Sequence, residues 1–122
     1  MDIDDTTMGT RLTIRDIQFV ADQAVILTED QARLEEIARS LATLNDVRFL
    51  VVGHTADVGM PEGQARLSLE RAQAVVREFI RRGLEPGLFD VEGRGGNEPV
   101  ATNATEEGRA RNRRVEIIIL EQ

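Results

Sequence analysis

The stretch RFLVVGHTADVGMPEGQARLSLERAQAVVREFIRRG, residues 48–83, decides the fold. It opens with an apolar run over residues 48–53, which predicts a buried strand because turn-forming residues bound it. After a glycine-containing loop, apolar residues recur at helical spacing from about Gln64 to Arg82, which predicts a helix. One face of this helix is expected to pack on the core, and its members are Ala72, Val75, Val76, Phe79 and Ile80.

Downstream of this stretch the sequence predicts two more strands. Gly83 ends the helix as its C-cap, and Pro86 prevents the helix from resuming. The elements expected after it are a strand over residues 88–93, a loop over 95–99, one helical turn over 105–110 and a last strand over 115–120.

Upstream, a strand and a helix complete the pattern. Residues 11–20 are rich in β-branched side chains and partly alternate, which predicts a strand. A helix is expected to begin at Thr28, since Thr28 and Gln31 fit a capping box, and to end at Asn45. Its buried stripe is expected to comprise Leu34, Ile37, Ala38 and Leu41.

The elements follow the order strand, helix, strand, helix, strand, strand, which is typical of an α+β fold. Helices long enough to be crossovers join the first three strands, so part of the sheet should be parallel. We expect a mixed four-stranded sheet with the two main helices packed on it. Residues 1–10 are polar and are interpreted as a lead-in or linker, and residues 11–122 as one domain.

The composition excludes several classes of protein. The net charge of −7 argues against a general nucleic-acid binder and against attraction to anionic membrane surfaces. The chain has no cysteine, which excludes disulfides and thiolate metal sites. No apolar run approaches the about 20 residues of a membrane span, and the acidic start is unlike an export leader. If the protein is exported, its leader is expected to lie outside this sequence.

The motifs that would indicate catalysis are weak. His54 is the one histidine, and a catalytic or zinc site would need partner histidines or cysteines that the sequence lacks. A structural histidine, bonded to backbone at the strand end, is the favoured interpretation. Gly93, Gly95 and Gly96 predict a tight loop rather than a phosphate cradle, because no helix follows closely and the chain has no lysine. We therefore expect no enzyme, no metal and no cofactor.

Polar residues beside the predicted core suggest a binding site instead. They lie in residues 53–59 after a buried strand, in residues 67–72 near the start of the second long helix, and in residues 112–116 entering the last strand. Arg71 adjoins the apolar face of its helix and should lie at the edge of the core. Because the helix dipole disfavours a cation near the amino end, a carboxylate partner or a bound anionic group should compensate Arg71.

The other arginines of these segments divide into two groups. Arg113 and Arg114 should point to opposite faces, because side chains alternate along a strand. Arg109, Arg111 and one of the pair at 113 and 114 are interpreted as surface charges that balance the 22 acids of the chain.

The chain resembles the OmpA-like family over about residues 14–120. The resemblance rests on GHTADVGMPEGQARLSLERAQAVVREFIRRGL, residues 53–84, and VEGRGGNEPVATNATEEGRARNRRVEIII, residues 91–119. The family pattern is GHTD, then LS and RA, then G-x-G and P, then N-x-T, EGRA and NRRVE. The segment IQFVADQAVILTEDQARLEEIARSL, residues 17–41, resembles the family's first strand and helix.

The resemblance implies an αβ sandwich in the periplasm, within a larger envelope or outer-membrane-associated protein, and no catalysis. It implies non-covalent binding of peptidoglycan, usually through the diaminopimelate of the stem peptide. In the family, the Asp of GHTD accepts the ligand's ammonium, and the Arg of LSxxRA, here Arg71, binds a ligand carboxylate. The remaining positions carried over as ligand-binding are Thr55, Ala56, Asp57, Gln64, Leu67 and Arg113.

The sequence departs from the family pattern at two of these positions. Ala56 replaces the family Asp, with Asp57 one residue later, and Gln64 replaces an Asn ahead of LS. A lost charge-assisted hydrogen bond costs ~1.5–3 kcal/mol, or roughly 10- to 150-fold in affinity. Three outcomes stay open: weak peptidoglycan binding, binding of another diamine such as ornithine or lysine through Asp57, or loss of wall binding in a scaffold or protein-interaction module.

Overall fold

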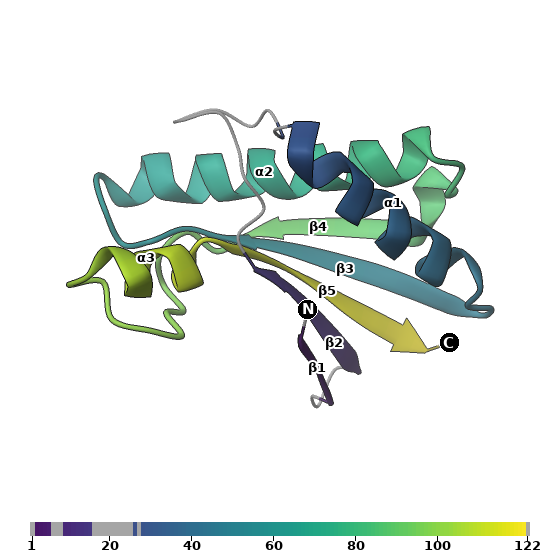
Figure 1. The fold of residues 1–122 in the computed structure, drawn as a ribbon, viewed down its shortest axis with the longest axis horizontal. Helices are drawn as coiled ribbons and strands as arrows, with labels where there is room; N and C mark the ends of the chain where they lie inside the picture. Colours follow the sequence, from purple (N-terminus) through teal and green to yellow (C-terminus); the bar gives the residue numbers. More distant parts are fainter. Residues whose placement is uncertain (1, 6–8, 16–25, 27, 122) are drawn as a thin grey trace.

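The computed structural model describes residues 2–5, 9–15, 26 and 28–121. A 3-10 turn, Pro86–Leu88, accompanies the strands and longer helices shown in Figure 1. Their bounds are β1 Asp2–Asp5, β2 Thr10–Arg15, α1 Thr28–Ala42, β3 Val47–His54, α2 Pro61–Arg81, β4 Phe89–Gly93, α3 Glu106–Asn112 and β5 Arg114–Glu121.

The strands form one mixed sheet in the order β1-β2-β5-β3-β4. β3 and β4 are parallel, with α2 as their crossover, and the other neighbouring pairs are antiparallel. The predicted α+β class, mixed sheet and partly parallel pairing are confirmed. β1 adds a strand to the four predicted, because Asp2–Asp5 pair with β2 at the sheet edge. This acidic segment lacks the apolar alternation that identifies a strand in sequence. The division of the chain at residue 10 stays a prediction.

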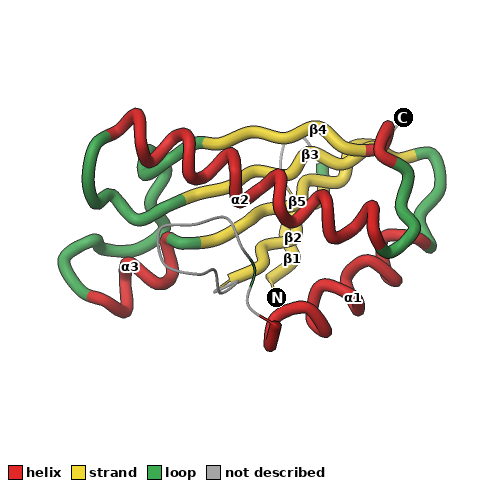
Figure 2. Tube along the Cα trace, turned by 90° about the horizontal axis from the view of Figure 1, so that it is seen from above, coloured by secondary structure: helices red, strands yellow, loops and turns green. Residues whose placement is uncertain are grey.

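The two long helices lie over the same face of the sheet (Figures 1 and 2). α3 lies at one end of the sheet, close to the loop that joins β3 to α2 (Figure 2). Among the described residues, no helix combines the length and apolarity needed to cross a membrane. The fold thus brings α3, the start of α2 and the end of β3 together at one end of the domain.

The predicted apolar faces of both long helices are buried. The stripe of α1 is buried at every predicted position, and so is the face of α2 except for the partly buried Ile80. Beneath the helices, Phe89 stacks on Phe49 and on Phe79, with ring centroids 5.4 and 5.9 Å apart. Aromatic and aliphatic side chains of β3, β4 and α2 therefore share one core.

The element boundaries differ from the predictions by a few residues. β2 covers Thr10–Arg15, and residues 16–20 of the predicted strand lie outside the described residues. α1 ends at Ala42, before the predicted Asn45. α2 begins at Pro61 rather than Gln64, since proline suits the first turn of a helix.

The end of α2 follows the prediction closely. Gly83 has a φ of +104°, the left-handed conformation that glycine adopts without strain. The N–H groups of Gly83 and Leu84 donate to the carbonyls of Ile80 and Phe79 at 3.0 and 3.1 Å. This is the hydrogen-bond pattern expected of a glycine that closes a helix.

Two glycines let α2 approach the sheet closely. Gly53 of β3 and Gly93 of β4 are register partners. A Cβ on Gly53 would lie 2.0 Å from the carbonyl oxygen of Ser68, and one on Gly93 would lie 2.4 Å from the backbone nitrogen of Leu69. These two positions therefore fix the depth of α2 at the end of the sheet where the polar segments gather.

Candidate functional site

A groove of about 520 Å³ lies where α2, α3 and the loop after β3 meet. It collects residues from segments that are more than 50 positions apart in the sequence. Its lining residues are Thr55, Ala56, Val58, Met60, Gly63, Gln64, Leu67, Arg71, Glu106, Arg109 and Arg113.

One wall of the groove is a face of α2. Gln64, Leu67 and Arg71 are spaced by three and four residues, so they lie on the same side of the helix. Gln64 is buried and Leu67 is half-buried, so this wall is well anchored. Arg71 is half-buried, in agreement with its predicted position at the edge of the core.

The opposite wall comes from α3 and its end. Glu106, Arg109 and Arg113 are spaced by three and four residues and all line the groove. α3 begins after Thr105, whose side chain accepts a hydrogen bond from the Gly108 N–H at 3.0 Å. This N-cap sets the start of a seven-residue helix that would otherwise be marginal.

Thr55 and Ala56 directly follow β3 and line the groove, and both are only 7% exposed. The Thr55 N–H donates to the carbonyl of Gly95 at 2.9 Å, which ties this loop to the loop after β4. Thr55 Oγ1 is buried without a hydrogen-bond partner among the described residues. A buried hydroxyl in that state lowers stability, and such costs are typical of functional sites.

Asp57 does not line the groove, although it follows Ala56 directly. Its Oδ1 accepts a hydrogen bond from Gln64 Nε2 at 3.2 Å, and the same amide donates to the carbonyl of Gly59 at 3.0 Å. A Cβ on Gly96 would come within 2.9 Å of the Asp57 Cα, so the neighbouring loop packs against Asp57. Gln64 therefore holds the Asp57 carboxylate among loop atoms.

The structure brings six of the seven predicted ligand-binding residues to the groove and leaves out Asp57. Their role in binding a ligand stays a prediction. Sequence reasoning missed Glu106 as a lining residue and interpreted Arg109 as a surface charge. The spacing of Glu106, Arg109 and Arg113 could have indicated a common face, because it follows the period of a helix.

Charged groups on the α3 side form an ion-pair cluster. Glu106 accepts hydrogen bonds from Arg113 at 2.6 Å and from Arg109 at 3.3 Å. The hydrogen bond and the charge of Arg113, with help from Arg109, lower the pKa of Glu106. Glu106 therefore stays ionised while the two guanidinium groups flank it.

A buried asparagine connects the loops behind this wall. Asn112 Oδ1 accepts from the N–H groups of Val100 and Ala101 at 2.8 and 3.0 Å. Its Nδ2 donates to Asn103 Oδ1 at 2.8 Å, and that oxygen also accepts from the Asp57 N–H at 3.3 Å. The loop before α3 and the loop after β3 are thus held in one hydrogen-bond network.

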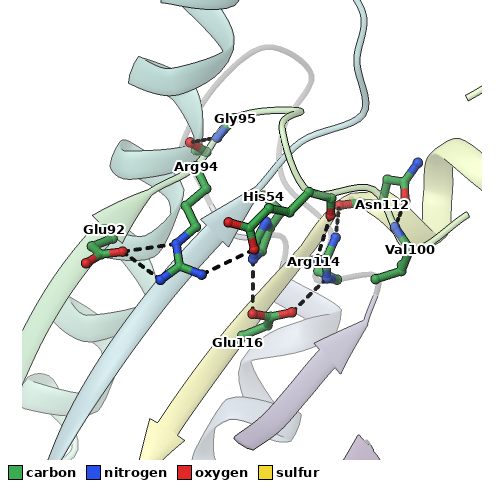
Figure 3. A network of polar contacts seen from close by, with 10 residues as sticks. His54, Glu92, Arg94, Gly95, Val100, Asn112, Arg114 and Glu116 are labelled. Carbon is green, nitrogen blue, oxygen red and sulfur yellow. Dashed lines mark hydrogen bonds and ion pairs between the residues drawn. The ribbon is translucent and has the colours of Figure 1, made fainter. Parts of the chain in front are cut away.

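A second polar cluster lies on the other face of the sheet. In Figure 3, His54 and Arg114 flank the carboxylate of Glu116, at 3.1 and 3.0 Å. Burial by itself would raise the pKa of Glu116, but the imidazole of His54 and the guanidinium of Arg114 outweigh burial and lower the pKa to about 2. Arg114 also donates to the carbonyls of Glu98 and Asn112. We name these three residues, His54, Arg114 and Glu116, the buried cluster.

The buried cluster corrects the prediction for His54 and decides which of the arginines at 113 and 114 is the surface charge. His54 is structural as expected, but its partner is the Glu116 side chain rather than backbone. One of the arginines at 113 and 114 was expected to be a surface charge, and Arg113 agrees with this, because its side chain is 39% exposed and pairs with the exposed Glu106, whereas the Arg114 side chain is only 4% exposed. The two arginines do serve different faces, because Arg113 ends α3 and Arg114 begins β5.

The helix-dipole argument for Arg71 is also wrong. Because α2 begins at Pro61, Arg71 lies almost three turns into the helix, where the dipole has little effect. The position of Arg71 in the groove, rather than the dipole, is what connects it to ligand binding.

The groove combines guanidinium groups with apolar side chains, which suits a ligand that carries a carboxylate on an aliphatic chain. Within the part of the chain that the structure describes, no three His, Cys, Asp or Glu side chains gather as metal ligands would. The glycines after β4 do not form an open anion cradle, because the Arg94 and Gly95 N–H groups donate to Gly53 and Ser68.

Comparison with known proteins identifies the family of this chain. The sequence profile of the OmpA family matches residues 18–113. Outer membrane protein A of Bordetella avium is 34% identical over 105 residues, which cover 86% of this chain and 54% of that protein. Peptidoglycan-binding protein ArfA of Mycobacterium bovis is 36% identical over 103 residues, covering 84% of this chain and 32% of that protein.

A solved structure has the same fold. The cell wall anchor of the T6SS from Pseudomonas aeruginosa superposes with a TM-score of 0.85 and 36% identity, covering 99% of this chain and 87% of that one. The names of these three relatives describe an outer membrane protein, a peptidoglycan-binding protein and a cell wall anchor. The chain spans about half the length of the Bordetella protein and about a third of the mycobacterial one.

Proposed function

Since this chain belongs to the OmpA family, we propose that it binds peptidoglycan non-covalently through the groove between α2 and α3. It would do so on the periplasmic side of the cell envelope, as one domain of a larger envelope protein. The names of a peptidoglycan-binding relative and of a cell wall anchor support this proposal. The observation that carries it is the convergence of Arg71, Thr55, Ala56, Leu67 and Arg113 on one groove.

Arg71 is the proposed anchor for a carboxylate of the stem peptide. A guanidinium can hold a carboxylate by two parallel hydrogen bonds, which gives orientation as well as affinity. Arg71 projects from a helix that packs tightly on the sheet through Gly53 and Gly93, so its backbone is well fixed. A fixed anchor loses less freedom when a ligand binds.

Ala56 is expected to weaken recognition of a diamino acid. Its methyl group lines the groove at the position where the family resemblance calls for a carboxylate. Asp57 could supply the charge for a different diamine, such as ornithine or lysine, only by leaving its contact with Gln64. We therefore propose weakened or altered preference rather than the diaminopimelate recognition that the resemblance implies.

Co-sedimentation with purified peptidoglycan sacculi tests the proposal. The wild-type chain should sediment with sacculi at low salt, and Arg71→Ala should reduce the sedimented fraction at least several-fold. Arg77→Ala is the matched control, because it removes the same charge from an exposed position of the same helix outside the groove. If the wild type stays in the supernatant, or if both variants behave alike, the proposal is wrong.

A protein-interaction module is the rival function. Val58 and Met60 are 64% and 72% exposed beside the groove, and apolar side chains in such positions can form part of a protein interface. The same sedimentation experiment separates the two functions, since a pure interaction module would not respond to sacculi at any salt concentration.

A further inference from the structure

The loop side of the groove is apolar where an ammonium-binding site would need a carboxylate. Ala56, Val58 and Met60 occupy alternate positions of this loop, and Leu67 lines the same groove from α2. Val58 and Met60 are mostly exposed, so their side chains are accessible to a ligand. This surface can contact a chain of methylene groups, but it offers no charge to an ammonium.

The charged side chains of the groove are mainly positive. Arg71, Arg109 and Arg113 line it, and Glu106 is the only acid among the lining residues that the structure describes. The chain as a whole has a net charge of −7, whereas the lining residues that the structure describes include three arginines and one acid. Such a local excess attracts carboxylates and disfavours ammonium groups.

Glu106 and Asp57, two acids at or beside the groove, are poorly placed to replace the missing carboxylate. Glu106 is bonded to Arg113 at 2.6 Å and to Arg109 at 3.3 Å, so an ammonium that reached it would approach two guanidinium groups. Like charges at such distances repel. Asp57 lies outside the lining and accepts a hydrogen bond from Gln64.

We propose that the groove recognises a carboxylate at the end of an aliphatic chain and does not require an ammonium group on the ligand. The guanidinium groups bind the carboxylate, and the apolar loop contacts the methylene groups. The inference rests on the proposed function and specifies its ligand. The groove binds the carboxylate and the methylene groups of the stem-peptide side chain, and it accepts that side chain with or without its amine.

A series of three seven-carbon dicarboxylates tests the inference directly. Pimelate has no amine, 2-aminopimelate has one, and meso-diaminopimelate has two, while the carboxylates and the chain length are the same. In NMR titrations of the wild-type chain, pimelate should bind at least as tightly as 2-aminopimelate, and diaminopimelate should be the weakest. If diaminopimelate is bound most tightly, the inference is overturned.

Substitutions at the apolar loop give the second arm of the test. Ala56→Asp should reverse the order, with roughly tenfold or greater preference for diaminopimelate over pimelate, because it restores a carboxylate for the ammonium. Ala65→Asp is the control, since it adds the same charge at an exposed position of α2 outside the groove. If Ala56→Asp leaves the order of affinities for the three dicarboxylates unchanged, the loop at position 56 does not contact the ligand's amine, and the inference is wrong.

Glu106 provides a third arm, because the inference and its rival predict opposite results. Glu106→Gln should raise the affinity for pimelate a few-fold, since it releases two guanidinium groups from their acid. If Glu106 accepts the ligand's ammonium instead, the same substitution should specifically weaken diaminopimelate binding, which would contradict the inference. Glu107→Gln is the matched control, because Glu107 is its exposed neighbour and does not line the groove.

Failure of the inference can be told apart from failure of the proposed function. Sacculi that retain the wild-type chain, together with a preference for diaminopimelate, would leave the function standing and overturn the inference. Absence of binding to sacculi and to all three dicarboxylates would overturn both. Sedimentation combined with the predicted order of the dicarboxylates supports both.

Discussion

Arg113 and Arg114 are neighbours in the chain, yet they belong to regions with opposite properties. Arg114 is 4% exposed in the buried cluster, where its guanidinium and the imidazole of His54 both contact the Glu116 carboxylate. Arg113 is 39% exposed and lines the groove with Arg71 and Arg109. One peptide step at the junction of α3 and β5 thus separates a cluster that stabilises the fold from a surface that is available to a ligand.

Arginine therefore has two roles in this chain: it stabilises the fold in the buried cluster, and it is available to a ligand in the groove. In the buried cluster, acidic and basic groups are paired and shielded from water, so removing one partner leaves another charge buried and unpaired. In the groove, guanidinium groups remain in contact with solvent, so a substitution costs little stability but changes what the groove attracts. Stability and binding should therefore respond to different members of the same motif.

Arg114→Ala is expected to have the largest effect on stability. It leaves Glu116 without its guanidinium in a buried position, which should lower the free energy of unfolding by about 3–5 kcal/mol. Arg113→Ala is the matched variant and should change stability by less than about 0.5 kcal/mol while weakening sacculus binding. Urea denaturation measures both, and equal losses of stability would contradict the division between the two regions.

Acid should remove the contribution of the buried cluster to the stability of the fold. The pKa of Glu116 is lowered to about 2 in the folded chain, from an ordinary value of 4.5, so its contribution to stability is complete above about pH 4.5. That contribution, up to about 3 kcal/mol, should be lost as the pH falls from about 4.5 toward 2. Denaturation of the wild type and of Glu116→Gln over this range measures it. A parallel pH dependence in both chains would show that Glu116 contributes nothing.

Gly53 in the sheet and Gly63 in α2 should also respond differently to substitution, because only Gly53 lies in close contact with another backbone segment. Gly53→Ala would place a Cβ 2.0 Å from the Ser68 carbonyl and should cost about 1–3 kcal/mol or more through forced displacement of α2. A Cβ on Gly63, which lines the groove on α2, would meet nothing within 4 Å. Gly63→Ala should therefore be neutral or stabilise the chain by up to about 1 kcal/mol. Thermal denaturation of the two variants checks the contrast, and a comparable loss in Gly63→Ala would contradict it.

Thr55→Val should stabilise the chain modestly, in contrast to the substitutions in the buried cluster. The hydroxyl of Thr55 is buried without a partner among the described residues, so its replacement by a methyl group should raise stability by about 1 kcal/mol. The reference is Thr43→Val, since the exposed Thr43 hydroxyl donates to the Ser40 carbonyl at 2.7 Å. Destabilisation in Thr55→Val that matches or exceeds the loss in Thr43→Val would mean that the Thr55 hydroxyl is well satisfied.

Much of the fold could be predicted because its signals are local. The apolar run that forms β3, the helical spacing in α2 and the Gly83 cap each depend on a few adjacent residues. β1 could not be predicted, because an acidic edge strand is defined by its pairing with β2 rather than by its own composition. The position of β5 between β2 and β3 is likewise a property of the assembled sheet.

The candidate site was predictable only in part, for the same physical reason. The family pattern identified Arg71 and the change at Ala56, and the structure places both on the groove. The pattern could not indicate that Gln64 holds Asp57 away from the lining, because that depends on where two side chains meet across a loop. Nor could it show that Glu106 accepts hydrogen bonds from both Arg109 and Arg113, because a shared helix face does not determine which side chains pair.

The position of the bound ligand on the chain can be measured by NMR. In a titration of the ¹⁵N-labelled chain with stem peptide released from sacculi, the amide signals of Thr55, Ala56, Leu67, Arg71 and Arg113 should shift together. The signals of Leu50 and Ile118, which lie on the sheet face that carries the buried cluster, should stay in place. Shifts confined to Leu50, Ile118 and their neighbours, or none anywhere, would contradict the assignment of the groove as the binding site.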